Sequence, residues 1–223
     1  MTTVVKQHKD DVLKQAAATL AKYPELIREI AAGVILHRKQ PSEHDDSPVY
    51  YNPDSDTRYS DSEKKVGVMY LGFSKEVALA ESFQAGQGVD DQPVTLSALA
   101  SSSLHQLRTA RILYVVDVAG LANRMTHHKL RDIVQAKGQG KEGYALTREF
   151  SRACMQLGMK IDGILYPSAV YSVTGSMDGC NLVLFAGRGT QVEPIDHIPV
   201  TEVVLSNGDI AVEFLDSLGV ALE

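Results

Sequence analysis

The hydrophobic pattern is clearest between Val66 and Phe83, where a short apolar run leads into a helix-like segment. Residues 66–73 are apolar apart from one tyrosine and too few for a typical helix, which predicts a buried strand. Ser74 follows, and serine is a favoured helix N-cap. The next ten residues suit a helix with almost no polar face. We therefore expect a strand and a helix joined at Ser74.

Glu81 interrupts the apolar surface of this predicted helix, because it lies between the azimuths of Val77 and Ala78. An ionised carboxylate in such a position is costly unless a cation or hydrogen-bond donors meet it. A structural ion pair would meet this need, and so would a functional site. Both interpretations make Glu81 a residue with an obligatory partner.

The N-terminal region has a helical composition over residues 10–32. Pro24 divides it into two helices, since proline is tolerated in a first turn and disrupts a helix interior. We therefore expect a helical N-terminal extension over residues 1–33, followed by a short strand over residues 34–36.

The rest of the chain alternates irregularly between strand and helix patterns. Residues 40–61 are rich in proline, aspartate and serine, which predicts a long ordered loop. About five or six strands and about five helices without βαβ alternation favour an α+β domain. The further predicted elements are a helix over 96–107, a strand over 111–118, a helix over 144–157, strands after Asp162 and over 181–185, and a hairpin of 201–205 with 210–214 across Asn207 and Gly208.

Composition limits the class of protein. Hydrophobic residues make up 44% of the 223 residues and charged residues 22%, as in soluble globular proteins. No apolar run approaches the roughly 20 residues of a membrane span, and the N-terminus lacks the order of a secretory signal. We therefore expect a cytoplasmic protein without membrane contact. The net charge of −6 argues against nucleic acid as the main ligand.

Metal and redox chemistry have no recognisable pattern in this sequence. The two cysteines form neither a disulfide framework nor a CxxC motif. The sequence contains no H-E-x-x-H, and the seven histidines are scattered apart from His127 and His128. Neither the G-x-S-x-G elbow nor the G-x-G-x-x-G loop is present. We expect no metal site.

A basic stretch runs from Arg124 to Lys141 in this otherwise acidic chain. Its glycines do not have the spacing of a phosphate loop. Such charge runs are usually solvated surface, and this one is also a candidate docking face for a partner.

Five polar residues near strand ends remain as site candidates. Arg38 follows a strand, Arg58 lies in the aromatic loop, Tyr70 lies in a strand, Glu81 lies on its helix and Ser168 lies in a turn. Singly, each has a plain structural explanation, as a loop arginine, a core tyrosine or a turn-capping serine. Together they describe a site that holds an anion, stacks a ring and places one carboxylate.

Several motifs around these residues occur in a definite order between residues 34 and 185. They are H-R at His37, R-Y-S at Arg58, V-M-Y-L-G-F-S-K-E-V-A-L-A-E at Val68, D-G-I-L-Y-P-S-A at Asp162 and N-L-V-L-F at Asn181. In these motifs the chain resembles the RES-domain family, the toxins of Xre–RES toxin–antitoxin pairs, named for an arginine, a glutamate and a serine. It departs from the family in D-S-D-T before Arg58, where glycines are usual, and in Val170, where an arginine is common.

The resemblance implies an α+β fold with a mixed, largely antiparallel sheet like that of ADP-ribosyltransferases. Residues 34–190 would form the NAD-binding catalytic domain, on which a C-terminal tail of residues 191–223 packs. Glu81, Arg38 and Ser168 would be catalytic, and Arg58, Tyr70 and again Arg38 would bind NAD, which is a substrate.

The resemblance also implies a toxin that cleaves the nicotinamide–ribose bond of NAD, as a glycohydrolase or a phosphorylase. Two alternatives are an ADP-ribosyltransferase that modifies a protein and a catalytically idle protein that binds its antitoxin. The expected partner is an Xre-like, DNA-binding antitoxin in a hetero-oligomer, with no direct DNA contact by this chain.

Overall fold

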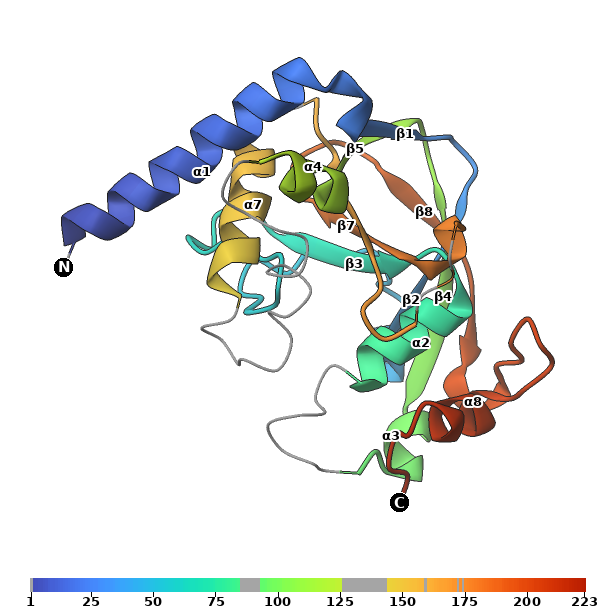
Figure 1. The fold of residues 1–223 in the computed structure, drawn as a ribbon. Coiled ribbons are helices and arrows are strands. Elements are labelled where there is room, and N and C mark those ends of the chain that lie inside the picture. Colours follow the sequence, from blue (N-terminus) through green and yellow to red (C-terminus); the bar gives the residue numbers. More distant parts are fainter. Residues whose placement is uncertain (1, 85–92, 126–143, 159, 172, 174) are drawn as a thin grey trace.

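The computed structural model describes residues 2–84, 93–125, 144–158, 160–171, 173 and 175–223 (Figure 1). Strands run over Ile27–Ile30 (β1), Ile35–Pro41 (β2), Val68–Gly72 (β3), Ser102–Thr109 (β4), Leu113–Asp117 (β5), Gly163–Pro167 (β6), Cys180–Phe185 (β7) and Val192–Pro199 (β8). Helices run over Thr2–Lys22 (α1), Lys75–Gln84 (α2), Leu96–Ala100 (α3), Val118–Arg124 (α4), Ala145–Gln156 (α7) and Ala211–Ser217 (α8). Short 3₁₀ turns cover Pro24–Leu26, Ser42–His44, Met177–Gly179 and Val200–Glu202.

The eight strands of the described residues belong to one sheet, in the order β1-β5-β6-β7-β3-β2-β4-β8. Among these strands β5 and β6 pair in parallel and the other pairs are antiparallel, so the sheet is mixed and largely antiparallel, as expected for an α+β domain. One buried cluster takes apolar side chains from every strand, including Ile30, Leu36, Leu107 and Val192. The sheet therefore curls around a core that its own inner face fills.

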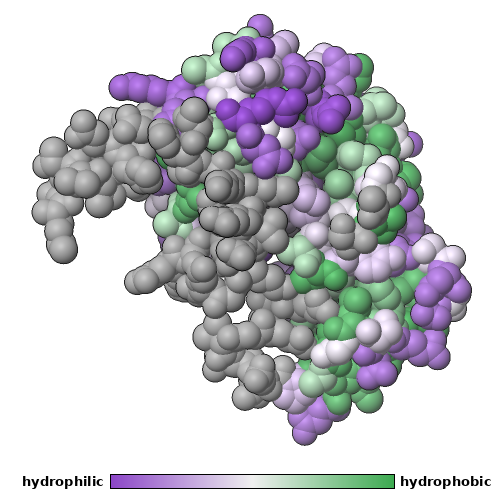
Figure 2. Space-filling view, viewed as in Figure 1, coloured by the Kyte–Doolittle hydropathy of each residue, from purple (hydrophilic) through white to green (hydrophobic). Residues whose placement is uncertain are grey.

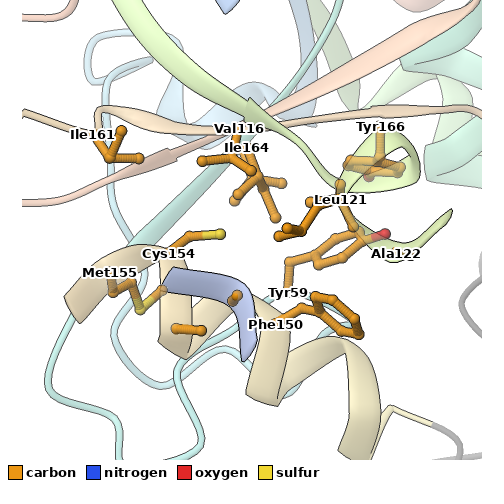
Figure 3. Packing of buried hydrophobic residues seen from close by; sticks show 14 of the residues in the cluster. Tyr59, Val116, Leu121, Ala122, Phe150, Cys154, Met155, Ile161, Ile164 and Tyr166 are labelled. Carbon is orange, nitrogen blue, oxygen red and sulfur yellow. The ribbon is translucent and has the colours of Figure 1, made fainter. Parts of the chain in front are cut away.

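Helices cover the outer faces of the sheet as two groups. Helices α1, α4 and α7 pack over β5, β6, β7 and β3, where Tyr59 lies among Leu121, Phe150 and Tyr166 (Figure 3). Burial of a large side chain such as Phe150 stabilises the fold by about 1.5–3 kcal/mol. Helices α2, α3 and α8 pack over the β4 end, and apolar side chains gather on the surface in that region (Figure 2).

The junction at Ser74 is confirmed. Strand β3 ends at Gly72, and the Ser74 Oγ accepts a hydrogen bond of 3.2 Å from the Val77 N–H at the start of α2. Gly72 is required here, because a Cβ at this position would lie 2.8 Å from the Ala78 nitrogen. The absence of a side chain thus lets α2 lie directly against the end of its strand.

Three predicted elements are wrong. Residues 24–32 form a 3₁₀ turn and strand β1 instead of a second helix, because pairing of Ile27–Ile30 with β5 outweighs local helix propensity. The predicted helix over 96–107 ends at Ala100, and the chain then enters β4, which is hydrogen-bonded on both sides.

The tail contains a helix where a second hairpin strand was expected. Asn207 and Gly208 do form a turn, with a single bridge between Val204 and Ile210. The residues after this turn form α8, which buries Ala211, Phe214 and Leu215. Their spacing of three and four residues has the helical period, which the alternating interpretation of residues 210–214 missed.

Candidate functional site

A cavity of about 510 Å³ opens where β2 and β3 diverge. These strands pair only at His37 and Gly72, so the sheet splits beyond that point. The loop after β2 and helix α2 supply the remaining walls. Four of the five predicted site residues line the cavity, namely Arg38, Arg58, Tyr70 and Glu81.

Glu81 is held by two hydrogen-bond donors from distant parts of the chain. The Ser168 Oγ donates to the Glu81 Oε1 at 2.7 Å, and the Asn181 Nδ2 donates to the same oxygen at 3.0 Å. Both bonds end on Oε1, and no hydrogen bond from the described residues reaches Oε2. The carboxylate is thus oriented through its Oε1 atom, and Glu81 lines the cavity.

Ser168, the fifth predicted residue, lies behind Glu81. Its side chain is buried, and its Oγ accepts hydrogen bonds from the Val170 and Tyr171 N–H groups at 3.2 and 3.0 Å. One hydroxyl therefore both caps the turn and holds Glu81. Because the two N–H groups occupy the oxygen, its proton is directed to Glu81.

Arg58 lies in a segment that is fixed on both sides. The Tyr70 hydroxyl accepts hydrogen bonds from the Thr57 Oγ1 and the Tyr59 N–H, both at 2.8 Å. From α7, Arg148 donates to the Thr57 carbonyl at 3.1 Å, and the Ser151 Oγ donates to the Tyr59 carbonyl at 2.7 Å. Tyr70 therefore anchors the two residues that flank Arg58, through the side chain of Thr57 and the backbone of Tyr59.

Tyr70 and Tyr166 line the cavity, and the buried Tyr59 packs against Tyr166. The rings of Tyr59 and Tyr166 are 4.6 Å apart (Figure 3). Burial raises the pKa of all three hydroxyls, and that of Tyr70 reaches about 12. For Tyr166 the negative charge of Glu81 adds to the effect of burial on the pKa. All three are neutral near pH 7, and Tyr70 and Tyr166 are uncharged aromatic groups in the cavity lining.

On β2, His37 is buried and Arg38 is partly buried. The Arg38 Nη1 donates to the Pro48 carbonyl at 2.6 Å, and burial lowers the pKa of its guanidinium. Burial, with a smaller effect from Lys75, lowers the pKa of His37 to about 4. His37 is therefore neutral at physiological pH, whereas Arg38 keeps its charge.

Asn181, Tyr166 and Lys39 also line the cavity, but the sequence did not mark them as candidate site residues. For Asn181 a signal existed, because a lone amide precedes the apolar residues of N-L-V-L-F in β7. Tyr166, whose ring contacts Tyr59, has no sequence pattern that marks it as a site residue.

Other expected features give less information. No group of three or more His, Cys, Asp or Glu among the described residues has the arrangement of a metal site. Within the same residues, no helix is long and apolar enough to cross a membrane. Of the basic stretch from Arg124 to Lys141, residues 126–143 lie outside the described part of the chain. Arg124 itself pairs with Glu25 at 3.7 Å.

The family model of the RES domain matches residues 35–203, which include all five predicted site residues. No curated protein and no solved structure matches the chain.

Proposed function

The chain belongs to the RES-domain family, and on this basis we propose that it is a toxin enzyme that cleaves the nicotinamide–ribose bond of NAD. The observation that carries the proposal is the carboxylate of Glu81. Ser168 and Asn181 hold it at the wall of a cavity that also contains Arg38 and Arg58. A fixed anion beside two cations suits a substrate with a positively charged ring and a pyrophosphate.

The reaction breaks the bond between C1′ of the ribose and the pyridinium nitrogen. The bonding electrons pass to the ring, so nicotinamide leaves as a neutral molecule and needs no strong acid. Positive charge develops on the ribose in an oxocarbenium-like transition state, as in other glycoside cleavages. The Glu81 carboxylate would stabilise this charge and accept hydrogen bonds from the ribose hydroxyls.

The other residues would bind and orient the substrate. Arg38 and Arg58 would hold the pyrophosphate, Tyr70 would flank the nicotinamide riboside, and Ser168 would keep Glu81 in position. An acceptor oxygen then bonds to C1′ and loses its proton. With water as acceptor the product is ADP-ribose, and with phosphate it is the corresponding sugar phosphate.

We also propose that the fold is a form of the ADP-ribosyltransferase fold. The support is a largely antiparallel sheet that splits between β2 and β3 over the cavity.

Purified protein incubated with NAD, with and without phosphate, tests the reaction. We expect release of nicotinamide, measured by chromatography, and a loss of about 10²-fold or more in Glu81→Gln. Glutamine keeps an oxygen for the Ser168 and Asn181 donors, so the variant should fold. Glu202→Gln, at an exposed position, is the matched control and should keep full turnover. Full turnover by Glu81→Gln would refute the assignment.

A cellular experiment separates toxin activity from the alternatives. Expression of this chain alone should arrest growth and lower cellular NAD, and co-expression of the neighbouring reading frame, the proposed antitoxin, should rescue growth. Arrest with unchanged NAD would instead favour ADP-ribosylation of a protein. Absence of arrest would favour the idle interaction protein.

A further inference from the structure

A second cavity of about 700 Å³ adjoins the first. The two cavities share Arg38, Lys39 and Ser82 as lining residues. From this shared wall the second cavity extends toward the loop after β2, where Tyr50 and His44 line it. A ligand at Glu81 can therefore continue past Arg38 into a further compartment.

The shared wall contains two neighbouring cations, Arg38 and Lys39. Burial lowers the pKa of both Arg38 and Lys39. Lys39 places its Nζ 4.9 Å from the ring centre of Phe83, and neither cation forms an ion pair with the described residues. Shielded charges of one sign are costly when unpaired, and a bound phosphate would offset that cost.

Tyr50 offers an aromatic face on the outer wall of the second cavity. Its side chain is 56% exposed, although tyrosine in a folded domain is usually more buried. The Tyr50 ring stacks on no other ring of the described residues. An exposed ring beside phosphate-binding cations is the arrangement that proteins use to stack a nucleobase.

The start of the loop that carries Tyr50 is anchored to β2 and β4. The Gln40 Nε2 donates to the His44 carbonyl at 2.6 Å. Asp45 accepts from the Ser103 Oγ at 3.0 Å and lies 3.0 Å from the His105 Nε2 on β4. The bond from Gln40 holds His44 in place on the cavity wall, and a preorganised wall lowers the entropic cost of binding.

We propose that the second cavity binds the adenosine half of the dinucleotide, an inference that rests on the proposed function. The phosphate nearer the adenosine lies at Lys39, beside Arg38, and the adenine stacks on Tyr50. Lys39 and Tyr50 thus determine specificity for a dinucleotide over a mononucleotide, because nicotinamide mononucleotide has no adenine to place on Tyr50.

Calorimetric titration with ADP tests this site without any turnover. We expect wild-type protein to bind ADP, and Tyr50→Leu or Lys39→Met to weaken binding roughly tenfold, in line with one lost stacking or phosphate contact. Methionine retains the apolar stem of Lys39 over Phe83. Tyr114→Leu, at an exposed position outside both cavities, should bind like wild type. Absence of ADP binding by the wild type, or unchanged binding by both variants, would overturn the proposal.

Turnover gives a second test. The ratio of kcat/KM for NAD to that for nicotinamide mononucleotide should fall roughly tenfold in Tyr50→Leu. An equal loss of kcat/KM for both substrates would overturn the assignment of Tyr50 to adenine. Failure of the wild type to consume NAD would refute the proposed function, and the ADP titration would still decide on this site.

Discussion

Acidification should destabilise the fold through His37. This side chain is buried on β2, and its Nδ1 has no hydrogen-bond partner among the described residues. Burial and Lys75, opposed by Glu76, lower its pKa from 6.5 to about 4. The unfolded chain therefore takes up a proton near pH 6.5, whereas the folded chain resists protonation until about pH 4. The contribution of neutral His37 to the free energy of unfolding is therefore fully present above pH 6.5 and is lost as the pH falls from 6.5 to about 4.

The pKa difference corresponds to about 3 kcal/mol, at about 1.4 kcal/mol for each pKa unit. Urea unfolding at a series of pH values from above 6.5 down to 4 measures the loss. Since other groups also titrate there, the informative quantity is the difference between wild type and His37→Leu. The variant should lack about 3 kcal/mol of the pH dependence and should be no less stable at neutral pH, because it removes an unpaired buried nitrogen.

His44→Leu is the control for this experiment, because the His44 side chain is 56% exposed. It should keep the wild-type pH dependence. Parallel stability curves for wild type and His37→Leu between pH 6.5 and 4 would refute the reasoning.

Three further predictions concern the site and the core. Arg58→Ala should raise KM for NAD more than Glu81→Gln does, because a pyrophosphate contact exists in both ground and transition states; steady-state kinetics showing only a kcat loss would contradict this role. Gly163→Ala should lower the free energy of unfolding by about 1–3 kcal/mol in urea, since its Cβ would lie 2.0 Å from a carbonyl oxygen of β7; wild-type stability would contradict this close approach. Asp162→Asn should cost about 3 kcal/mol in the same assay, because its buried carboxylate accepts from the Arg111 Nη1 at 2.9 Å; a change near zero would show that the pair contributes little.

Local sequence was sufficient for elements whose pattern matched their surroundings. The apolar run before Ser74 and the cap at Ser74 predicted β3 and the start of α2, because both depend on neighbouring residues. Residues 144–157 likewise gave α7, whose apolar stripe packs on the sheet. The motifs were also specific enough to predict the RES-domain family, which the family model confirms.

Local sequence failed where partners far along the chain decided the structure. Residues 27–30 have an acceptable helical composition, yet strand β5, some ninety residues later, supplies hydrogen bonds that make them a strand. Similarly, β4 is a strand because β2 and β8 flank it on both sides.

In the candidate site, too, local sequence predicted some features and distant contacts decided the others. The sequence by itself determined that Glu81, on an apolar helix, must meet a cation or a hydrogen-bond donor, since burying an unpartnered carboxylate is too costly. Only the tertiary structure decided that Ser168 and Asn181, 87 and 100 residues away, are the partners. The cavity likewise depends on the divergence of β2 and β3 and on the curl of the sheet, which bring Arg38 and Arg58 to the same wall as Glu81. These are distances between segments, and a linear pattern of residue types does not contain them.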